Sequence, residues 1–336
     1  MTALACCALD LGIKVGGSDV EEIFVTDRVL KQRKISWKKG FEAGHLVPRP
    51  DLVITTGAHG GLSNPEVLAA AQQKIPVLTQ GQTLGKIMAD KDGISVCGGG
   101  GKTTTSARIA TMLAFGRRHP SYAVGVAEIN PLGSGGKYDK GREFVAEADE
   151  YANSPGVDNR PKFHFQKPKI IVVTNIEYDH PDVYKNLEQT KKIFVDFFSG
   201  LPKDGLLVAC ADNQNTWGVV KDLGLNRQTY GFSAKADWQI VKSFFGQEQT
   251  IFSLAYQGVV IEDIKIKVPG RFNVLNATAA FAVATQLGLD AKTIKTGLLN
   301  FGGTKRRFEL VGEANGIKLY DDYGHHPNEI KEVLLA

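Results

Sequence analysis

The chain has 336 residues, of which 43% are hydrophobic and 23% are charged, a composition typical of a globular protein long enough for two or three domains. Its formal net charge is only +4, and its charged residues form no basic stripe, which argues against a nucleic-acid partner. No apolar run approaches the roughly 20 residues that span a bilayer, and the start lacks the basic region of a targeting signal. The four cysteines have neither metal-binding nor disulfide spacing, so we expect a cytoplasmic protein with no membrane partner.

Helices and short apolar strands alternate over residues 1–90, which predicts an α/β unit with a parallel, Rossmann-like sheet. The predicted elements are a helix at 4–12, strands at 13–15, 51–56 and 75–78, and a helix at 64–74 that begins with Asn-Pro. Asp19 follows the first of these strands, where such folds commonly hold a ribose or a base. An aspartate in a surface turn is an equal alternative. The first predicted helix has no strand ahead of it, so we expect this unit to be incomplete at its start.

The pattern of residues 91–301 predicts a second, central α/β unit. A strand at 94–97, a glycine loop and a helix from 102 to about 115 open it, and further strands are expected at 144–147, 169–175 and 206–211. Between 238 and 268 the hydrophobic period changes to two, which indicates an antiparallel ribbon at the edge of the sheet. Two helices, at 273–287 and 291–299, are expected to close the unit.

Residues 302–336 predict the beginning of a third, Rossmann-like unit, with its first strand at 317–320 and a helix from Pro327 onward. So few residues cannot make a domain of their own, so we expect the sequence to be cut at this end as well.

The glycine loop Gly98-Gly-Gly-Gly-Lys102-Thr103 lies between a predicted buried strand and a predicted helix, which is the setting of a phosphate-binding loop. Backbone N–H groups and the helix N-terminus would face the phosphates, while Lys102 reaches the terminal phosphates and Thr103 takes Mg²⁺. The general spacing would also place glycine at Val96, so this is a shortened loop. A flexible glycine linker is the alternative, and the loop alone does not separate a kinase, a GTPase and a ligase.

Two predicted strands end in groups that bind metals. Glu147 ends the strand at 144–147, and Asp179-His180 follows the next strand. Ligands gather at the carboxyl ends of parallel strands, so Glu147 and His180 are candidate ligands of the divalent ions that bridge the reacting phosphates. Each residue taken singly is more often a hydrogen-bonding or capping group.

The order of these motifs resembles the Mur ligase family. The resemblance covers residues 17–336 and includes the shortened loop with Thr103 and Thr104, the strand-end Glu147, Thr174-Asn-x-x-x-Asp-His180, Pro269-Gly-Arg-Phe-Asn273-x-x-Asn276, Lys305-Arg-Arg-Phe308 and Asp321-Asp-Tyr-Gly-His-His-Pro327. It implies an ATP-dependent ligase of cell-wall synthesis with Mg²⁺ as cofactor. The last segment is most similar to the branch whose small-molecule substrates are UDP-N-acetylmuramate and L-alanine. Ligases that recycle murein tripeptide, and a non-catalytic nucleotide-binding protein, are the alternatives.

The resemblance assigns roles residue by residue. It implies catalytic roles for Lys102, Arg306, Arg307, His325 and His326. It implies ATP contacts for Gly98, Gly99, Gly100, Gly101, Lys102, Thr103, Thr104, Asn273, Asn276 and Asp322, with the two asparagines at the adenine end. Asp19, Asn175 and Tyr323 would contact the substrates, and Thr103, Glu147 and His180 would hold the metal, with Glu150 as an alternative to Glu147. A solvated basic turn would equally explain the two arginines outside this context.

The chain departs from the family pattern at several positions. Gly99 and Gly100 replace side-chain-bearing residues of the loop, which makes the loop more flexible and adds an ordering cost to phosphate binding. Phe272 stands where a histidine is common, so stacking on adenine would replace a hydrogen bond. Tyr178 and Pro181 also differ from the commonest residues. Because both ends are expected to be incomplete, we expect this polypeptide by itself to be a poorly active or inactive form of a monomeric or weakly dimeric ligase.

Overall fold

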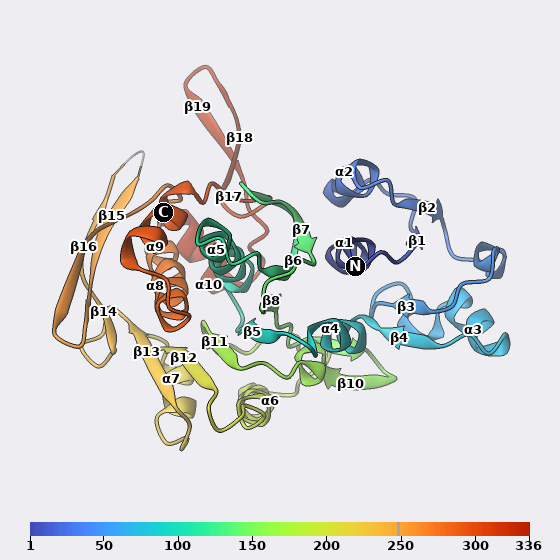
Figure 1. The fold of residues 1–336 in the computed structure, drawn as a ribbon, viewed down its shortest axis with the longest axis horizontal. Helices are drawn as coiled ribbons and strands as arrows, with labels where there is room; N and C mark the ends of the chain where they lie inside the picture. The colour runs from blue at the N-terminus through green and yellow to red at the C-terminus, as the bar shows by residue number, and fades with distance from the viewer. Residues whose placement is uncertain (247–248) are drawn as a thin grey trace.

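A mixed eleven-stranded β-sheet forms the centre of the molecule in the computed structural model, which describes residues 1–246 and 249–336. Its parallel part runs in the order β13 (Arg227–Gly231), β12 (Leu206–Cys210), β11 (Ile170–Val173), β5 (Asp92–Cys97) and β8 (Glu143–Glu147). Beyond β8 lie β6 (Ser121–Asn130), β7 (Gly133–Lys137) and the short β17 (Gly303–Thr304). Beyond β13, β14 (Trp238–Phe245), β15 (Thr250–Tyr256) and β16 (Val259–Ile266) form an antiparallel ribbon at the sheet edge (Figure 1).

The central strands are apolar on both faces because helices cover both sides of the sheet. Ile94 and Val96 of β5 pack with α5 (Lys102–Phe115), α8 (Arg271–Gln286) and α9 (Ala291–Asn300) in one core. Ile171 and Val173 of β11 pack on the opposite face with α6 (Leu187–Phe198) and α7 (Gln214–Val220). Strands buried on both faces read as continuous apolar runs rather than as alternating ones. This pattern confirms the predicted α/β class and the predicted edge ribbon.

The predicted central elements agree with the observed ones, and α5 begins at Lys102 as expected. Strand β5 begins two residues earlier than predicted, and β11 is shorter than the predicted 169–175. The pattern missed β6 and β7, and also the small hairpin of β9 (Ala152–Ser154) and β10 (Asp158–Pro161), which leads into the 3₁₀ turn η3 (Lys162–Phe165).

The N-terminal unit contains two separate pairs of parallel strands. Strand β1 (Gly16–Asp19) pairs with β2 (Ser36–Lys39), and β3 (Val53–Thr55) pairs with β4 (Val77–Thr79). The helices are α1 (Thr2–Asp10), α2 (Val25–Gln32), α3 (Pro65–Gln72) and α4 (Gln80–Met88), with 3₁₀ turns η1 (Ala43–Leu46) and η2 (Gly61–Ser63). The predicted Asn-Pro start of α3 is confirmed, because the Asn64 side chain accepts a hydrogen bond from the Glu66 N–H.

The predicted strand at residues 13–15 is wrong, because β1 starts at Gly16. Both β1 and its partner β2 are largely exposed, so no buried apolar run marks their position.

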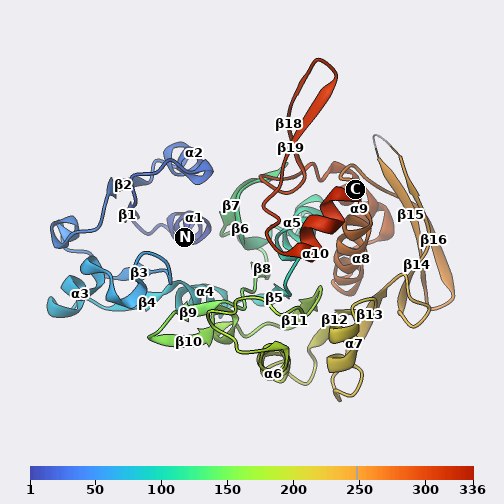
Figure 2. The same ribbon diagram turned by 180° about the vertical axis from the view of Figure 1, so that it is seen from behind.

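A hairpin and a helix end the chain. Strand β18 (Glu309–Ala314) pairs antiparallel with β19 (Ile317–Asp321), and α10 (Pro327–Leu334) follows. The predicted strand at 317–320 is therefore not the first of its unit, because β18 precedes it, whereas the helix from Pro327 is confirmed. Figure 2 shows α10 in front of α5 and α8, while the hairpin projects away from the sheet. Among the described residues, no helix is long and apolar enough to cross a membrane.

Candidate active site

The glycine loop connects the carboxyl end of β5 to the N-terminus of α5. Gly98 and Gly101 have φ angles of 128° and 82°, which side chains rarely adopt, so these two positions require glycine. The loop is tied to the end of β11, because the Gly100 N–H donates to Asn175 Oδ1 at 2.9 Å and the Thr174 hydroxyl donates to the Cys97 carbonyl at 3.2 Å. No side chain within residues 1–246 and 249–336 caps α5, so the first N–H groups of this helix are free to bind an anion.

Lys102 is held in a buried ion pair. Its Nζ lies 2.9 and 3.0 Å from the two carboxylate oxygens of Glu150, and it also donates to the carbonyls of Gly98 and Gly99 at 2.6 and 3.2 Å. The Glu150 side chain is only 4% exposed. Tyr184 fixes the backbone at this point by donating its hydroxyl to the Glu150 carbonyl. The lysine that reaches phosphates in such loops is therefore paired with a carboxylate inside the protein.

Carboxylates control the charge of this lysine. Burial by itself lowers the pKa of Lys102, but Glu150, Asp149 and Glu147 together outweigh burial and raise that pKa above its ordinary value. Asp149 is balanced in turn by Lys162, whose Nζ lies 2.7 Å from Asp149 Oδ2. Burial opposes ionisation of Asp149, yet Lys162 and Lys102 lower its pKa. Lys102 is thus a permanent cation in this site.

His180 lies beside the same carboxylates, and together with Asp149 and Glu150 it forms a group whose ligand atoms lie within 4.8 Å of one another. His180 Nε2 is 3.6 Å from Glu150 Oε1 and 3.6 Å from Asp179 Oδ2. Burial lowers the pKa of His180, but the neighbouring Glu150 carboxylate and the charge of Asp179 outweigh burial, so the pKa is raised. Two carboxylates and an imidazole form a donor set that suits a divalent cation.

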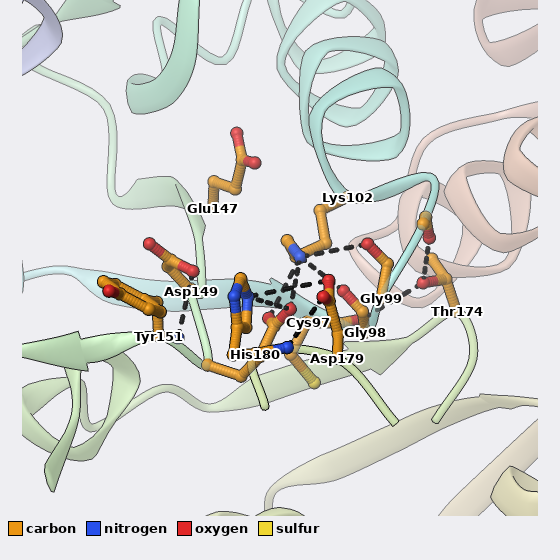
Figure 3. Close-up of polar contacts among 12 residues, drawn as sticks. Cys97, Gly98, Gly99, Lys102, Glu147, Asp149, Tyr151, Thr174, Asp179 and His180 are labelled. Carbon is orange, nitrogen blue, oxygen red and sulfur yellow. Dashed lines mark hydrogen bonds and ion pairs between the residues drawn. The ribbon is translucent and has the colours of Figure 1, made fainter. Parts of the chain in front are cut away.

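Glu147 lies apart from that group. Its Oε1 accepts a hydrogen bond from the Thr103 hydroxyl at 3.0 Å, and its Oε2 accepts one from the Gly125 N–H at 2.7 Å. Figure 3 shows the Glu147 carboxylate set apart from Asp149 and His180 and pointing away from them. The predicted metal ligands therefore divide into two separate sets. Thr103 and Glu147 form one, and His180 with the alternative ligand Glu150 belongs to the other.

A cavity extends from the glycine loop to α8. The predicted adenine-end residues Asn273 and Asn276 line it, although their side chains are almost completely buried, and Phe272 lies next to them. The loop residues Gly99, Gly100, Gly101, Thr103 and Thr104 line its other end, with Asn175 beside them. A phosphate-binding end and an apolar end with a few polar groups are what a nucleotide pocket requires.

The C-terminal segment supplies a further wall of this cavity, but only with some of the predicted residues. Asp322, Arg307 and His326 line it, together with Glu329 of α10. Asp322 is held by the N–H groups of Phe308 and Gly324, each 2.7 Å from one of its oxygens.

Of the predicted residues of this segment, Arg306, Tyr323 and His325 do not line the cavity. Arg306 and Arg307 place their guanidinium carbons 4.8 and 5.4 Å from the centre of the half-exposed Tyr323 ring. The imidazole ring of His325 packs edge-on against that ring.

Asp19 belongs to the N-terminal unit, at the end of β1. One of its oxygens lies 3.9 Å from His59 Nε2, and the other residues of the phosphate site are not among its partners. The structure therefore does not bring Asp19 together with the glycine loop.

The sequence patterns did not identify several residues of the site. Asp149, Lys162, Tyr184 and Glu177 join the site through side-chain contacts, and Arg108 lies behind its wall. The adjacent acids of Glu147-Ala-Asp-Glu150 were the available signal, but the direction in which each side chain points depends on packing around the strand end.

Comparison with known proteins identifies a family whose members match this chain. Residues 96–284 match the family described as Mur ligase middle domain, and residues 1–92 match the Mur ligase family, catalytic domain. The UDP-N-acetylmuramate–L-alanine ligase of Geotalea daltonii is 39% identical over 336 residues, covering the whole chain and 71% of that relative. The ligase of the same name from Geobacter sulfurreducens is 38% identical, covering the whole chain and 70% of that relative.

Solved structures agree with the sequence comparison. The UDP-N-acetylmuramate–alanine ligase of Thermotoga maritima superimposes with a TM-score of 0.85 at 27% identity, covering 100% of this chain and 74% of that one. A UDP-N-acetylmuramate:L-alanyl-γ-D-glutamyl-meso-diaminopimelate ligase from Neisseria meningitides gives 0.77 at 25% identity, covering 91% and 96%. A MurF ligase from Thermotoga maritima in complex with ADP gives 0.63 at 17% identity, covering 85% and 71%, and shows likeness of fold alone.

Proposed function

The chain belongs to the Mur ligase family, and from this premise we propose that it joins L-alanine to the carboxylate of UDP-N-acetylmuramate with consumption of ATP, in peptidoglycan synthesis. Mur ligases depend on ATP, and the glycine loop with its buried lysine supplies a place for the phosphates. The choice of L-alanine rests on the relatives of that name, which match the whole chain at 37–40% identity in the first four cases.

The phosphates of ATP would lie against the glycine loop. The N–H groups at the start of α5 would face them, and Lys102 would exchange Glu150 for the terminal phosphate. An anion stays beside the lysine in both states, and the Glu150 carboxylate that Lys102 releases would still face His180.

The residues around Lys102 fit Mg²⁺. Oxygen ligands are available in two sets, Thr103 with Glu147 and Asp149 with Glu150, and the His180 imidazole belongs to the second set. A bound Mg²⁺ would neutralise charge that develops on the transferred phosphoryl group. The protein's own part at Asp149 is to keep the carboxylate ionised, because Lys162 and Lys102 lower its pKa.

The reaction proceeds in two steps. The muramoyl carboxylate oxygen attacks the γ-phosphorus, the bond to the β-phosphate oxygen breaks, and ADP leaves. The amine of L-alanine then attacks the carbonyl carbon of the acyl phosphate, inorganic phosphate leaves, and the amine gives up a proton. Lys102 and Arg307 would stabilise charge on the transferred group, with Arg306, His325 and His326 nearby on the C-terminal segment. Asp322 would hold the nucleotide, Tyr323 and Asn175 would meet the substrates, and Asp19 would contact the UDP part.

One observation carries the proposal: the cavity that runs from the glycine loop to Asn273 lies in a chain whose whole length matches L-alanine ligases. Phosphate release from ATP should be measured on the purified protein, with UDP-N-acetylmuramate and either L-alanine or murein tripeptide. We expect release that depends on L-alanine. We expect Lys102→Ala to lower it by at least about 100-fold, because a cation facing the transferred phosphoryl group is lost. The exposed Lys203→Ala is the matched control and should retain the wild-type rate.

Two other outcomes would reject the proposal. Release with the tripeptide alone would assign the chain to the recycling ligases, one of which is similar in structure. Nucleotide binding without release in the presence of either acceptor would favour a non-catalytic protein.

A further inference from the structure

Arg108 is a fully buried charge on α5, and no residue role discussed above depends on it. Its side chain is 0% exposed, and among the described residues it forms no ion pair with a carboxylate. Burying a guanidinium without a carboxylate partner costs folding free energy, so we expect a function in the contacts that Arg108 makes.

The contacts of Arg108 lead to one residue of the nucleotide pocket. Nη1 donates to the Asn273 carbonyl, and Nη2 donates to the Asn273 side-chain oxygen Oδ1 at 3.2 Å. The guanidinium carbon lies 5.1 Å from the ring centre of Phe301, which also lines the pocket. Arg108 does not line the pocket itself, so it acts on a ligand only through the residues that do.

These contacts fix the orientation of the Asn273 amide. Its oxygen faces a guanidinium, which can only donate, and its nitrogen donates to the Pro269 carbonyl at 2.7 Å, which can only accept. If the amide were flipped, its N–H groups would face the Arg108 donors and its oxygen would face the Pro269 carbonyl, and both hydrogen bonds would be lost. The fixed amide keeps one N–H and one oxygen lone pair that these contacts do not use.

A donor and an acceptor side by side match adenine. Adenine presents an amino group next to a ring nitrogen, and the asparagine amide pairs with both at once, whereas guanine presents two acceptors at the corresponding edge. We propose that Arg108 is a positioning residue that fixes the Asn273 amide and thereby makes the pocket prefer adenine to guanine nucleotides. The inference rests on the proposed function, because it takes the cavity as the ATP site.

Binding constants for ATP and GTP, measured by calorimetry on the purified protein, test this role. Wild type should prefer ATP. Arg108→Met keeps the volume and removes the donors, so we expect the ratio of GTP to ATP dissociation constants to fall about tenfold, the worth of one hydrogen bond. Arg108→Lys keeps the charge but provides a single donor, so its ratio should lie between those of wild type and Arg108→Met. The adjacent buried Ile109→Val perturbs the same helix without touching Asn273 and should keep the wild-type ratio.

A structural role alone would give a different pattern. If the Arg108 variants weaken ATP and GTP equally, or if wild type shows no preference, the inference is overturned. If Arg108→Met fails to fold, Arg108→Lys decides, since an unchanged ratio in that variant overturns the inference too. Failure of the proposed function is distinguishable from these results, because it would appear as absent L-alanine-dependent phosphate release while the nucleotide preference and its dependence on Arg108 remain.

Discussion

At the scale of single residues, Lys102 and Glu150 have the clearest energetic link to function. Both side chains are largely buried, and the carboxylate contacts the ammonium with both oxygens. A buried ion pair is costly to break from one side, because the remaining charge stays desolvated. A phosphate that arrives beside Lys102 can replace the carboxylate, so the stability of the pair and the binding of ATP are linked.

Glu150→Gln is predicted to destabilise the protein and to increase the stabilisation that ATP provides. Loss of the carboxylate leaves Lys102 without its counter-ion, at a cost of about 3–5 kcal/mol in the unfolding free energy. Bound ATP then supplies the missing negative charge. Thermal unfolding with and without ATP should therefore show a lower melting temperature for the variant and a larger ATP-induced rise than for wild type.

Glu143→Gln is the matched control for this prediction. Glu143 is equally buried and paired with Arg118, but it lies at the other end of β8. This variant should lose stability while keeping the wild-type rise on addition of ATP. Equal rises in the Glu150 and Glu143 variants would show that the Lys102 pair is not linked to nucleotide binding.

The sequence predicts the position of a functional residue well only where local secondary structure determines that position. Lys102 and Thr103 follow a buried strand and open a helix, so their location follows from local pattern. Whether Glu147 or Glu150 faces His180 depends on rotamers and on partners such as Lys162, which lies 13 positions away from Asp149. Arg108 shows the same limit, because a helical pattern at that position predicts an apolar residue and says nothing of a partner 165 positions away.

At the scale of elements, the glycine loop works because its backbone follows a path closed to most side chains. A Cβ at Gly98 would collide with the Thr174 hydroxyl and lie 2.6 Å from the Asn175 carbonyl oxygen. A Cβ at Gly99 would meet its nearest atoms, on Asn175 and Glu177, at 3.3 Å. Only the first position combines a clash with a positive φ angle.

Gly98→Ala is therefore predicted to weaken ATP binding at least about tenfold, since strain of about 1–3 kcal/mol falls on the phosphate-binding backbone. Gly99→Ala should stay within about threefold of wild type, because shifts of a few tenths of an ångström relieve its contacts with Asn175 and Glu177. Titration calorimetry with ATP measures both. Equal losses in the two variants would mean that the loop geometry described here is not the one that binds ATP.

The burial of each strand explains whether the sequence predicts it. Strands β5, β11 and β12 are apolar on both faces, so their runs are visible without any knowledge of partners. Strands β1 and β18 are largely exposed, and β7 reads Gly-Ser-Gly-Gly-Lys. These three segments form strands because they pair with a neighbouring strand, and the hydrophobic periodicity of a sequence does not reveal such pairing.

At the scale of the whole molecule, helix α1 joins the N-terminal unit to the central sheet. Leu4 and Cys7 pack with Phe144 of β8, and Asp10 accepts a hydrogen bond from the Tyr138 N–H at 3.0 Å. The approach to β7 is close, because a Cβ at Gly136 would collide with the Ala3 carbonyl. The position of the unit that we propose for the UDP part therefore depends on a glycine in another unit.

Gly136→Ala is predicted to displace α1, to lower the unfolding free energy by about 1–3 kcal/mol, and to raise KM for UDP-N-acetylmuramate while ATP binding stays unchanged. The reason is that the clash moves one substrate unit and leaves β5 and the glycine loop in place. Gly218→Ala is the control, since nothing lies within 4 Å of its Cβ, and it should be neutral or stabilise α7 by about 0.5–1 kcal/mol. Melting temperatures, steady-state kinetics and ATP calorimetry test the three statements. A Gly136→Ala protein that binds both substrates like wild type, or that loses both equally, would show that the contact of α1 with β7 does not set the position of the N-terminal unit.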